Sequence, residues 1–185
     1  MTEKPSERRE YFRITDQAIV SLNTISAEQS LAPLLNTHSS FIIRSDINAL
    51  ELVNQALARK IKRSDPDLSQ YFDVINKKIE LIASNIIRSS AEFLARKPID
   101  INLSASGIAI QTDTEYSVGD HVSIQLLLLP EYNGIICLGQ IKQINKENNS
   151  SHVAIDFTEM READRELIIK HTMSKQLEQA RNKNT

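Results

Sequence analysis

Residues 99–110 read Ile-Asp-Ile-Asn-Leu-Ser-Ala-Ser-Gly-Ile-Ala-Ile, and this stretch decides the fold. Apolar and polar residues alternate as far as Leu103, which is typical of a β-strand with one buried face. The alternation puts Asn102 and Ser104 on the same, polar face. Gly107 allows either a positive backbone φ or the close approach of another group where the chain turns into the next strand. We therefore predict a β-hairpin that presents an amide and a hydroxyl together, each able to donate and to accept a hydrogen bond.

Further strands are predicted on both sides of this hairpin in the sequence. The segment from Phe12 to Leu22 alternates in the same way and is predicted to be the first strand of the same barrel. After the hairpin, strands are predicted at residues 107–110, 122–128, 134–144 and 153–157, with the polar run 145–151 as a loop. A C-terminal helix is expected next, with inward-facing candidates at Met160, Ala163, Leu167, His171 and Ala180. The fold class is therefore α+β, with an antiparallel β-barrel.

Helices are predicted to interrupt the barrel after its first strand. Apolar residues recur at three and four positions from Ile47 to about Arg63, which predicts an amphipathic helix with Asp46 as its N-cap. Residues 24–45 carry no such pattern and are predicted to be irregular, with a short helix near 31–35. A second helix should begin at the Asp65-Pro66 pair, because aspartate is a good N-cap and proline fits the first helical position.

This second helix is predicted to run to about Arg96, since Pro98 forbids its continuation. Its apolar residues follow a heptad pattern at Leu68, Phe72, Ile75, Ile79, Ile82, Ile86 and Phe93. Isoleucine at both core positions of a heptad favours more than two strands, so we expect a trimer or a tetramer. A second apolar stripe, at Val74, Leu81, Ile87 and Leu94, lies on another side of the helix. The alternative is that both stripes are buried within one subunit.

An arginine cluster precedes the first strand, at Arg8, Arg9 and Arg13. The guanidinium group stays charged, binds phosphate or the O6/N7 edge of guanine with two donors, and stacks on flat rings. A group of three arginines therefore suits an anionic purine ligand. The plainer alternatives are a solvated N-terminal tail for the arginines and an ordinary turn for the Asn-x-Ser-x-x-Gly motif.

The two motifs together, with the strand pattern after Gly107, resemble the PilZ domain. The resemblance covers residues 8–22 and 98 to about 171, and it implies a discontinuous barrel from residues 1–22 and 98–185 around a helical, oligomerising insertion at 23–97. It also implies a binding site for cyclic di-GMP formed by Arg8, Arg9, Arg13, Asn102, Ser104 and Gly107. The long heptad-bearing insertion is similar to that of an atypical, oligomerising branch of the family, and a tetramer is the state favoured on this ground.

The composition excludes several classes of protein. A formal net charge of −2 argues against binding of DNA or RNA through bulk charge. No apolar run is long enough to span a bilayer, and the polar N-terminus is not a secretion signal, so we expect a cytoplasmic protein. The single cysteine, Cys137, excludes an internal disulfide and is expected to be buried. The histidines lack ligand spacing and no phosphate loop is present, so neither a metal, nor a cofactor, nor catalysis is expected.

We therefore expect a bacterial, non-enzymatic receptor for cyclic di-GMP that self-associates through its helical insertion and signals to a downstream protein. The oligomerising branch includes members that do not bind the nucleotide. The alternative is accordingly a ligand-independent adaptor that recruits a partner for motility, or for pilus or flagellar function.

Overall fold

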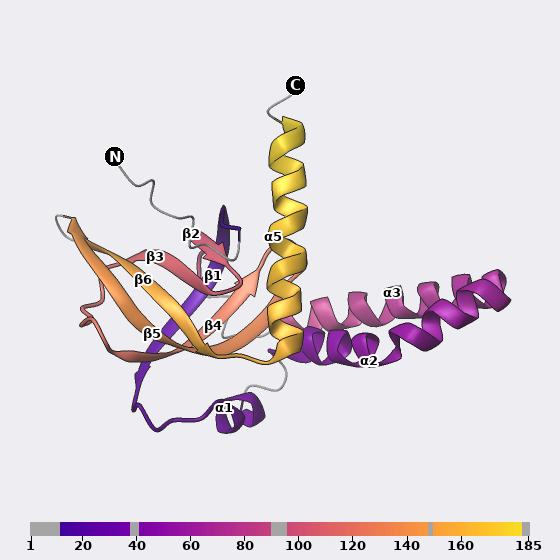
Figure 1. The fold of residues 1–185 in the computed structure, drawn as a ribbon, viewed down its shortest axis with the longest axis horizontal. Coiled ribbons are helices and arrows are strands. Elements are labelled where there is room, and N and C mark those ends of the chain that lie inside the picture. The colour runs from indigo at the N-terminus through magenta and orange to yellow at the C-terminus, as the bar shows by residue number, and fades with distance from the viewer. Residues whose placement is uncertain (1–11, 38–40, 90–95, 148–149, 183–185) are drawn as a thin grey trace, which may run out of the picture.

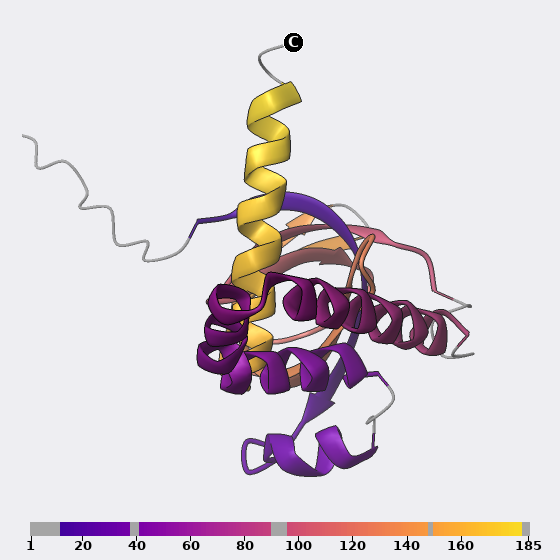
Figure 2. The same ribbon diagram turned by 90° about the vertical axis from the view of Figure 1, so that its right-hand side faces the viewer.

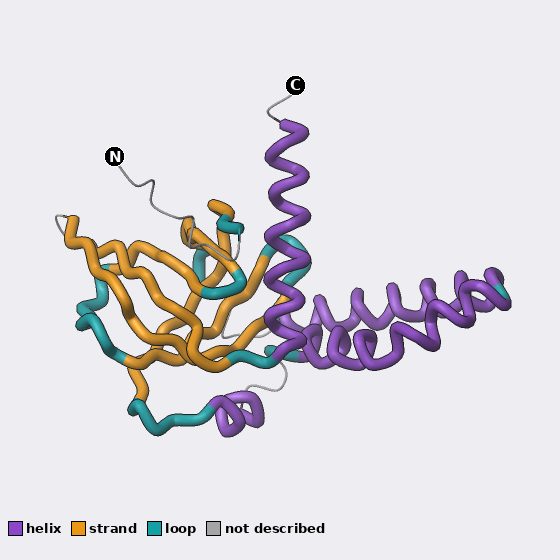
Figure 3. The backbone as a smooth tube through the Cα atoms, viewed as in Figure 1, coloured by secondary structure: helices purple, strands orange, loops and turns teal. Residues whose placement is uncertain are grey.

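A computed structural model describes residues 12–37, 41–89, 96–147 and 150–182. The described strands close into an antiparallel barrel in the order β1-β2-β3-β6-β5-β4, with helices gathered on one side (Figures 1 and 3). The strands are β1 (Ile14–Ile25), β2 (Ile99–Ser104), β3 (Gly107–Thr112), β4 (His121–Leu128), β5 (Asn133–Glu147) and β6 (Ser150–Glu159). The helices are α1 (Leu31–Thr37), α2 (Ile43–Ser64), α3 (Pro66–Arg88) and α5 (Glu162–Asn182).

The interior of the barrel is filled by the apolar residues that alternate along each strand, as predicted. Their side chains are almost completely buried, for example Leu103, Ile124 and Ile155. Cys137 belongs to the same core, and its burial raises the pKa of the thiol. The helices of the described residues include none that is long and apolar enough to cross a membrane.

Two strands are longer than the sequence predicts. The polar run 145–151 was expected to be a loop, but β5 continues to Glu147 and β6 begins at Ser150, so this prediction was wrong. The reason is that polar residues suit a strand pair that extends beyond the body of the barrel into solvent. At the other end of the chain, α5 buries the predicted Ala163, Leu167 and His171, while Ala180 is exposed.

The helical insertion forms a hairpin that projects from the barrel (Figures 1 and 2). Asp65 caps α3 as predicted, since its carboxylate accepts a hydrogen bond of 3.0 Å from the backbone N–H of Leu68. The predicted cap at Asp46 was wrong. The α2 helix already begins at Ile43, and Asp46 lies in its first turn, where a carboxylate still interacts favourably with the helix dipole.

The base of the insertion packs on the outer face of β1, β4 and β5. Ile19 of β1, Leu127 of β4 and Ile136 of β5 form a second apolar cluster with Phe41 and Ile87 of the insertion. The fit is close at Gly134, where a Cβ atom would lie 1.9 Å from the carbonyl oxygen of Phe41. One side of the barrel is thereby covered by helices.

Buried polar contacts fasten the insertion to α5. Ser45 of α2 donates a hydrogen bond to Asp164, which also accepts one of 2.9 Å from Arg161 Nε. Burial raises the pKa of Asp164, and the hydrogen bonds from Arg161 and Ser45 limit that rise. Asn48 adds a hydrogen bond of 3.2 Å to the carbonyl oxygen of Ala163. The hairpin base, α5 and the barrel are therefore joined by hydrogen bonds as well as by apolar packing.

Candidate functional site

The register of β1 and β2 brings the two predicted motifs together. Ile14 lies opposite Leu103 and Thr15 lies opposite Asn102. Arg13 precedes Ile14, so its backbone lies next to the turn that follows β2, and its side chain is exposed. Arg8 and Arg9 lie outside the described residues. The barrel thus places the end of the arginine cluster beside the Asn-x-Ser-x-x-Gly turn, although the two are distant in the sequence.

Asn102 lies on the outer face of the barrel, as predicted. It is half-buried, between Thr15 on one neighbouring strand and Ala109 on the other. Among the residues that the structure describes, its side-chain amide has no hydrogen-bonding partner, so a donor and an acceptor are both available to a ligand. Ala109 in turn lies opposite Ala154 of β6, and both alanines are half-exposed. Because alanine side chains are short, no bulky side chain rises from the surface at these two positions, and a planar group could lie there.

Ser104 does not lie on the surface with Asn102, contrary to the prediction. The residue is only 1% exposed. Its hydroxyl group donates to the carbonyl oxygen of Gly107 over 3.3 Å and lies 3.1 Å from the hydroxyl group of Ser106. The side chain of Ser104 is therefore enclosed by the turn and hydrogen-bonded within it. Ser106, which is exposed, presents its hydroxyl group at this turn, and sequence reasoning missed it because it stands outside the alternation.

Gly107 is required for close packing. A Cβ atom at this position would lie 2.4 Å from the carbonyl oxygen of Ile155, so the second of the two predicted reasons holds. Arg165 of α5, which the sequence did not single out, donates a hydrogen bond of 2.6 Å to the carbonyl oxygen of Ala105. The backbone of the turn is thus held by close packing against β6 on one side and by a hydrogen bond from α5 on the other.

The start of β1 is also held by α5. Asp16 points inward, and its carboxylate lies 2.6 Å from His171 Nε2 and 3.3 Å from Lys175 Nζ. Gln179 donates a hydrogen bond of 3.1 Å to the carbonyl oxygen of Thr15. The α5 helix therefore contacts both halves of the candidate site, the start of β1 and the turn after β2.

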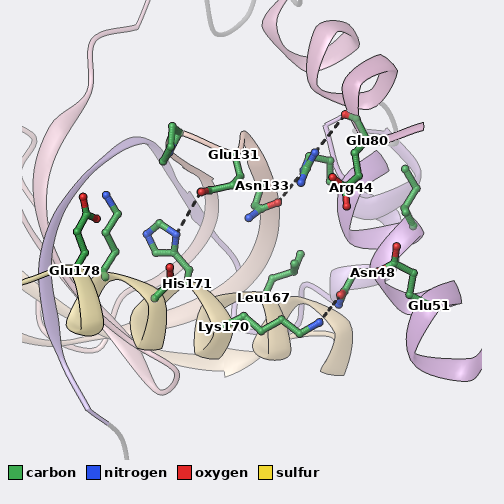
Figure 4. A pocket seen from close by; sticks show the side chains of 14 residues that line it. Arg44, Asn48, Glu51, Glu80, Glu131, Asn133, Leu167, Lys170, His171 and Glu178 are labelled. Carbon is green, nitrogen blue, oxygen red and sulfur yellow. Dashed lines mark hydrogen bonds and ion pairs between the residues drawn. The ribbon is translucent and has the colours of Figure 1, made fainter. Parts of the chain in front are cut away.

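A polar cavity of about 390 Å³ lies between α2, α3, α5 and the turn before β5 (Figure 4). Its cations are already engaged. Arg44 donates to Asn133 over 2.8 Å, Lys170 donates to Asn48 over 2.8 Å, and Lys175 contacts Asp16. The geometry is that of a hydrogen-bonded joint between helices and barrel, and we assign no ligand to it.

The hairpin exposes apolar side chains along its length. Of the predicted interface, Leu68, Phe72, Ile79, Ile82 and Ile86 are exposed, Ile75 is half-buried, and Phe93 lies outside the described residues. The second predicted stripe is divided: Ile87 packs against the barrel, whereas Val74 and Leu81 are exposed, and Leu94 is not described. The α2 helix contributes Leu50, Val53 and Leu57, which the sequence analysis did not assign to an interface.

These features define an antiparallel β-barrel that carries a projecting helical hairpin. Residues 85–174 match the family model described as the PilZ domain. The chain therefore contains a PilZ domain. Because the match begins within α3, strand β1 and the arginine cluster lie outside the matched residues. PilZ domains are generally non-enzymatic binding modules.

A solved structure with the same fold supports this assignment of the fold. A Xanthomonas campestris protein, described as a tetrameric PilZ domain self-assembled via an unusual helical bundle, has a TM-score of 0.57 and 12% identity. The alignment covers 92% of this chain and 89% of that one. The motility inhibitor MotI/DgrA of Bacillus subtilis has a TM-score of 0.49 and 12% identity, over 95% of this chain and 54% of that one. None of the curated proteins matches the sequence.

Proposed function

We propose that this protein is a receptor for cyclic di-GMP that self-associates through the α2–α3 hairpin. The observation that carries the proposal is the pairing of β1 with β2, which brings Arg13 to the turn beside Asn102. The face of β2, β3 and β6 next to this turn lies away from β1, β4 and β5, whose outer face holds the insertion. An anionic purine ligand can therefore approach it.

In this proposal the arginines bind the phosphates and the guanine edges. Arg13 contributes from the start of β1, and Arg8 and Arg9 join it from the preceding segment. The free amide of Asn102 forms hydrogen bonds with a guanine edge, and the flat base packs on the short side chains of Ala109 and Ala154. Ser104 and Gly107 act indirectly by fixing the turn, and Ser106 offers a hydroxyl group to the ligand. Binding would fix the arginines against the barrel and change the surface that a partner protein meets.

Titration calorimetry with cyclic di-GMP tests the nucleotide site. Arg13→Ala is expected to weaken binding about ten- to a hundredfold, because each bidentate charged contact contributes roughly 1 to 3 kcal/mol. Arg9→Ala should have a similar effect, and Asn102→Ala a smaller one. The melting temperature of each variant should stay close to that of the unmodified protein, since these side chains lie outside the core.

Arg63→Ala is the matched control, since Arg63 is an exposed arginine near the tip of the hairpin and far along the chain from the site. It should bind the nucleotide as the unmodified protein does. If the unmodified protein releases no heat at high micromolar nucleotide, the receptor proposal is wrong. If Arg13→Ala binds normally, Arg13 is not part of the site.

Self-association is proposed on the exposure of the heptad residues of α3. Ile79 and Ile86 are 42% and 39% exposed, which leaves large apolar groups in contact with water in a single chain. The double variant Ile79→Glu, Ile86→Glu should raise the dissociation constant of the oligomer at least about a hundredfold, because several unpaired carboxylates would be buried together. Light scattering measures the change, and a tetramer is the expected state of the unmodified protein.

The barrel of the double variant should stay folded and keep its affinity for the nucleotide, because its core residues come from other elements. A monomeric mass for the unmodified protein at micromolar concentration would show that the exposed stripe does not drive assembly.

The alternative function is a ligand-independent adaptor that recruits a protein for motility, pilus or flagellar function. Burial of Ser104 favours it, since one of the expected ligand contacts is occupied by the turn itself. Met173 and Leu177 on the outer side of α5 also favour it, as they are 58% and 62% exposed and could contact a partner. Absence of nucleotide binding, with the oligomer intact, would support this function.

A further inference from the structure

The α2 helix carries an apolar stripe of its own. Leu50, Val53 and Leu57 follow one another at spacings of three and four residues, so they lie on one face of the helix. They are 65%, 81% and 56% exposed. A face of this kind, on a helix that projects into solvent, loses contact with water only when another molecule covers it.

The charged residues next to this stripe indicate its orientation. Asp46 precedes Leu50 by four residues, and Lys60 follows Leu57 by three, so the stripe has a carboxylate at one end and an ammonium group at the other. The side chain of Asp46 is still 51% exposed, although it binds Arg161. The last turn of α2 adds two further cations, Lys62 and Arg63.

We infer that α2 packs antiparallel against α2 of a second copy of the chain, with Val53 at the centre of the contact. The inference rests on the self-association in the proposed function, which uses the heptad residues of α3, and it adds a second contact surface on α2 together with the direction of packing. Val53 lies at the middle of α2 (Ile43–Ser64). If the two-fold axis passes beside Val53, the two helices lie side by side along their full length. Leu50 then meets Leu57 of the second copy, and Asp46 meets Lys60 of the second copy.

A parallel arrangement is disfavoured by charge and by space. It would place the cationic ends of both helices together and leave both carboxylates at the opposite end. It would also bring two barrels to the same end of the pair. In the antiparallel arrangement the barrels lie at opposite ends of helices that are each about 33 Å long, at about 1.5 Å per residue.

Cysteine cross-linking in the full chain tests both the surface and the direction. The native thiol does not interfere, because Cys137 is fully buried and burial raises its pKa. Disulfides form only when the two Cα atoms are within about 7 Å. Under mild oxidation, Val53→Cys is expected to give a covalent dimer in most of the chains. Leu50→Cys and Leu57→Cys should each give little dimer alone, and a mixture of the two should give the mixed dimer.

Lys62→Cys is the control, since Lys62 is exposed on the same helix but stands outside the stripe. If Leu50→Cys and Leu57→Cys each form dimers efficiently alone, the helices pack in parallel and the inference is wrong. If Val53→Cys does not exceed the control although light scattering shows an oligomer, α2 is not the contact, and only this inference fails. A monomer in light scattering overturns it together with the proposed self-association. Calorimetry on Val53→Cys reports the nucleotide site separately.

Discussion

Replacement of Ile101 by aspartate is expected to unfold the barrel. Ile101 is 2% exposed and lies in the core, on the strand that pairs with both β1 and β3. The residue opposite Ile101 on β1 is Asp16, whose carboxylate already contacts His171 and Lys175. A second carboxylate at residue 101 would therefore lie among apolar core residues beside a like charge, and burying it would cost several kcal/mol, comparable with the total stability of about 5–15 kcal/mol of a typical domain. Far-ultraviolet circular dichroism should show loss of the β-signal, and the protein should be largely insoluble.

Asn102→Asp is the matched control for this variant. It adds the same charge on the next residue of the same strand, but on the outer face. It should fold and melt close to the unmodified protein. Equal damage from both variants would mean that β2 does not have one inner and one outer face.

Gly134→Val is expected to detach the helical insertion from the barrel, at a cost of at least about 3 kcal/mol. A Cβ atom at Gly134 would lie 1.9 Å from the carbonyl oxygen of Phe41 and 2.9 Å from its carbonyl carbon. Because both are backbone atoms, the clash can be relieved only if the segment before α2 moves away. The free-energy cost should therefore lie at the upper end of the range that is usual for overpacking. Hydrogen exchange should show protection lost near the start of α2, while β2 and β3 stay protected.

Gly119→Val provides the comparison. Gly119 has a φ of +97° in a turn, where an added Cβ atom meets no atom within 4 Å, so we expect the cost there to arise mainly from the backbone, on the order of 1–2 kcal/mol. Exchange near the start of α2 should be unchanged in this variant. If Gly134→Val leaves that exchange unchanged as well, Gly134 does not hold the insertion on the barrel.

The sequence predicted most of the fold because its local signals are strong. Strand alternation at Ile101 and Leu103 marks a buried face, and the Asp65-Pro66 pair marks the start of α3 by a mechanism that the structure confirms. The start of α2 was missed because it depends on a contact far along the chain, between Phe41 and Gly134. No local pattern reports such a contact.

The candidate site was predictable in part. The family resemblance assigned Arg13 and Asn102 to one site, and the register of β1 and β2 brings the two residues close together. Alternation failed at Ser104, where the strand ends and the turn forms its own hydrogen bonds. Arg165 could not be found either, because its role depends on how α5 docks against the turn. The outward face of α2 was missed because an amphipathic pattern does not show which side meets the rest of the protein.

The position of the insertion has a consequence for the order of folding. In the sequence, the α2–α3 hairpin lies between β1 and both strands with which β1 pairs. The pairs Ile14–Leu103 and Ile19–Leu127 can therefore form only after the chain beyond the hairpin has been made. Contacts of such high contact order form slowly, whereas a helical hairpin assembles from neighbours in the chain. During synthesis, β1 and the whole hairpin leave the ribosome before the barrel can close. The apolar face of the hairpin is therefore available to nascent chains on neighbouring ribosomes before the barrel exists.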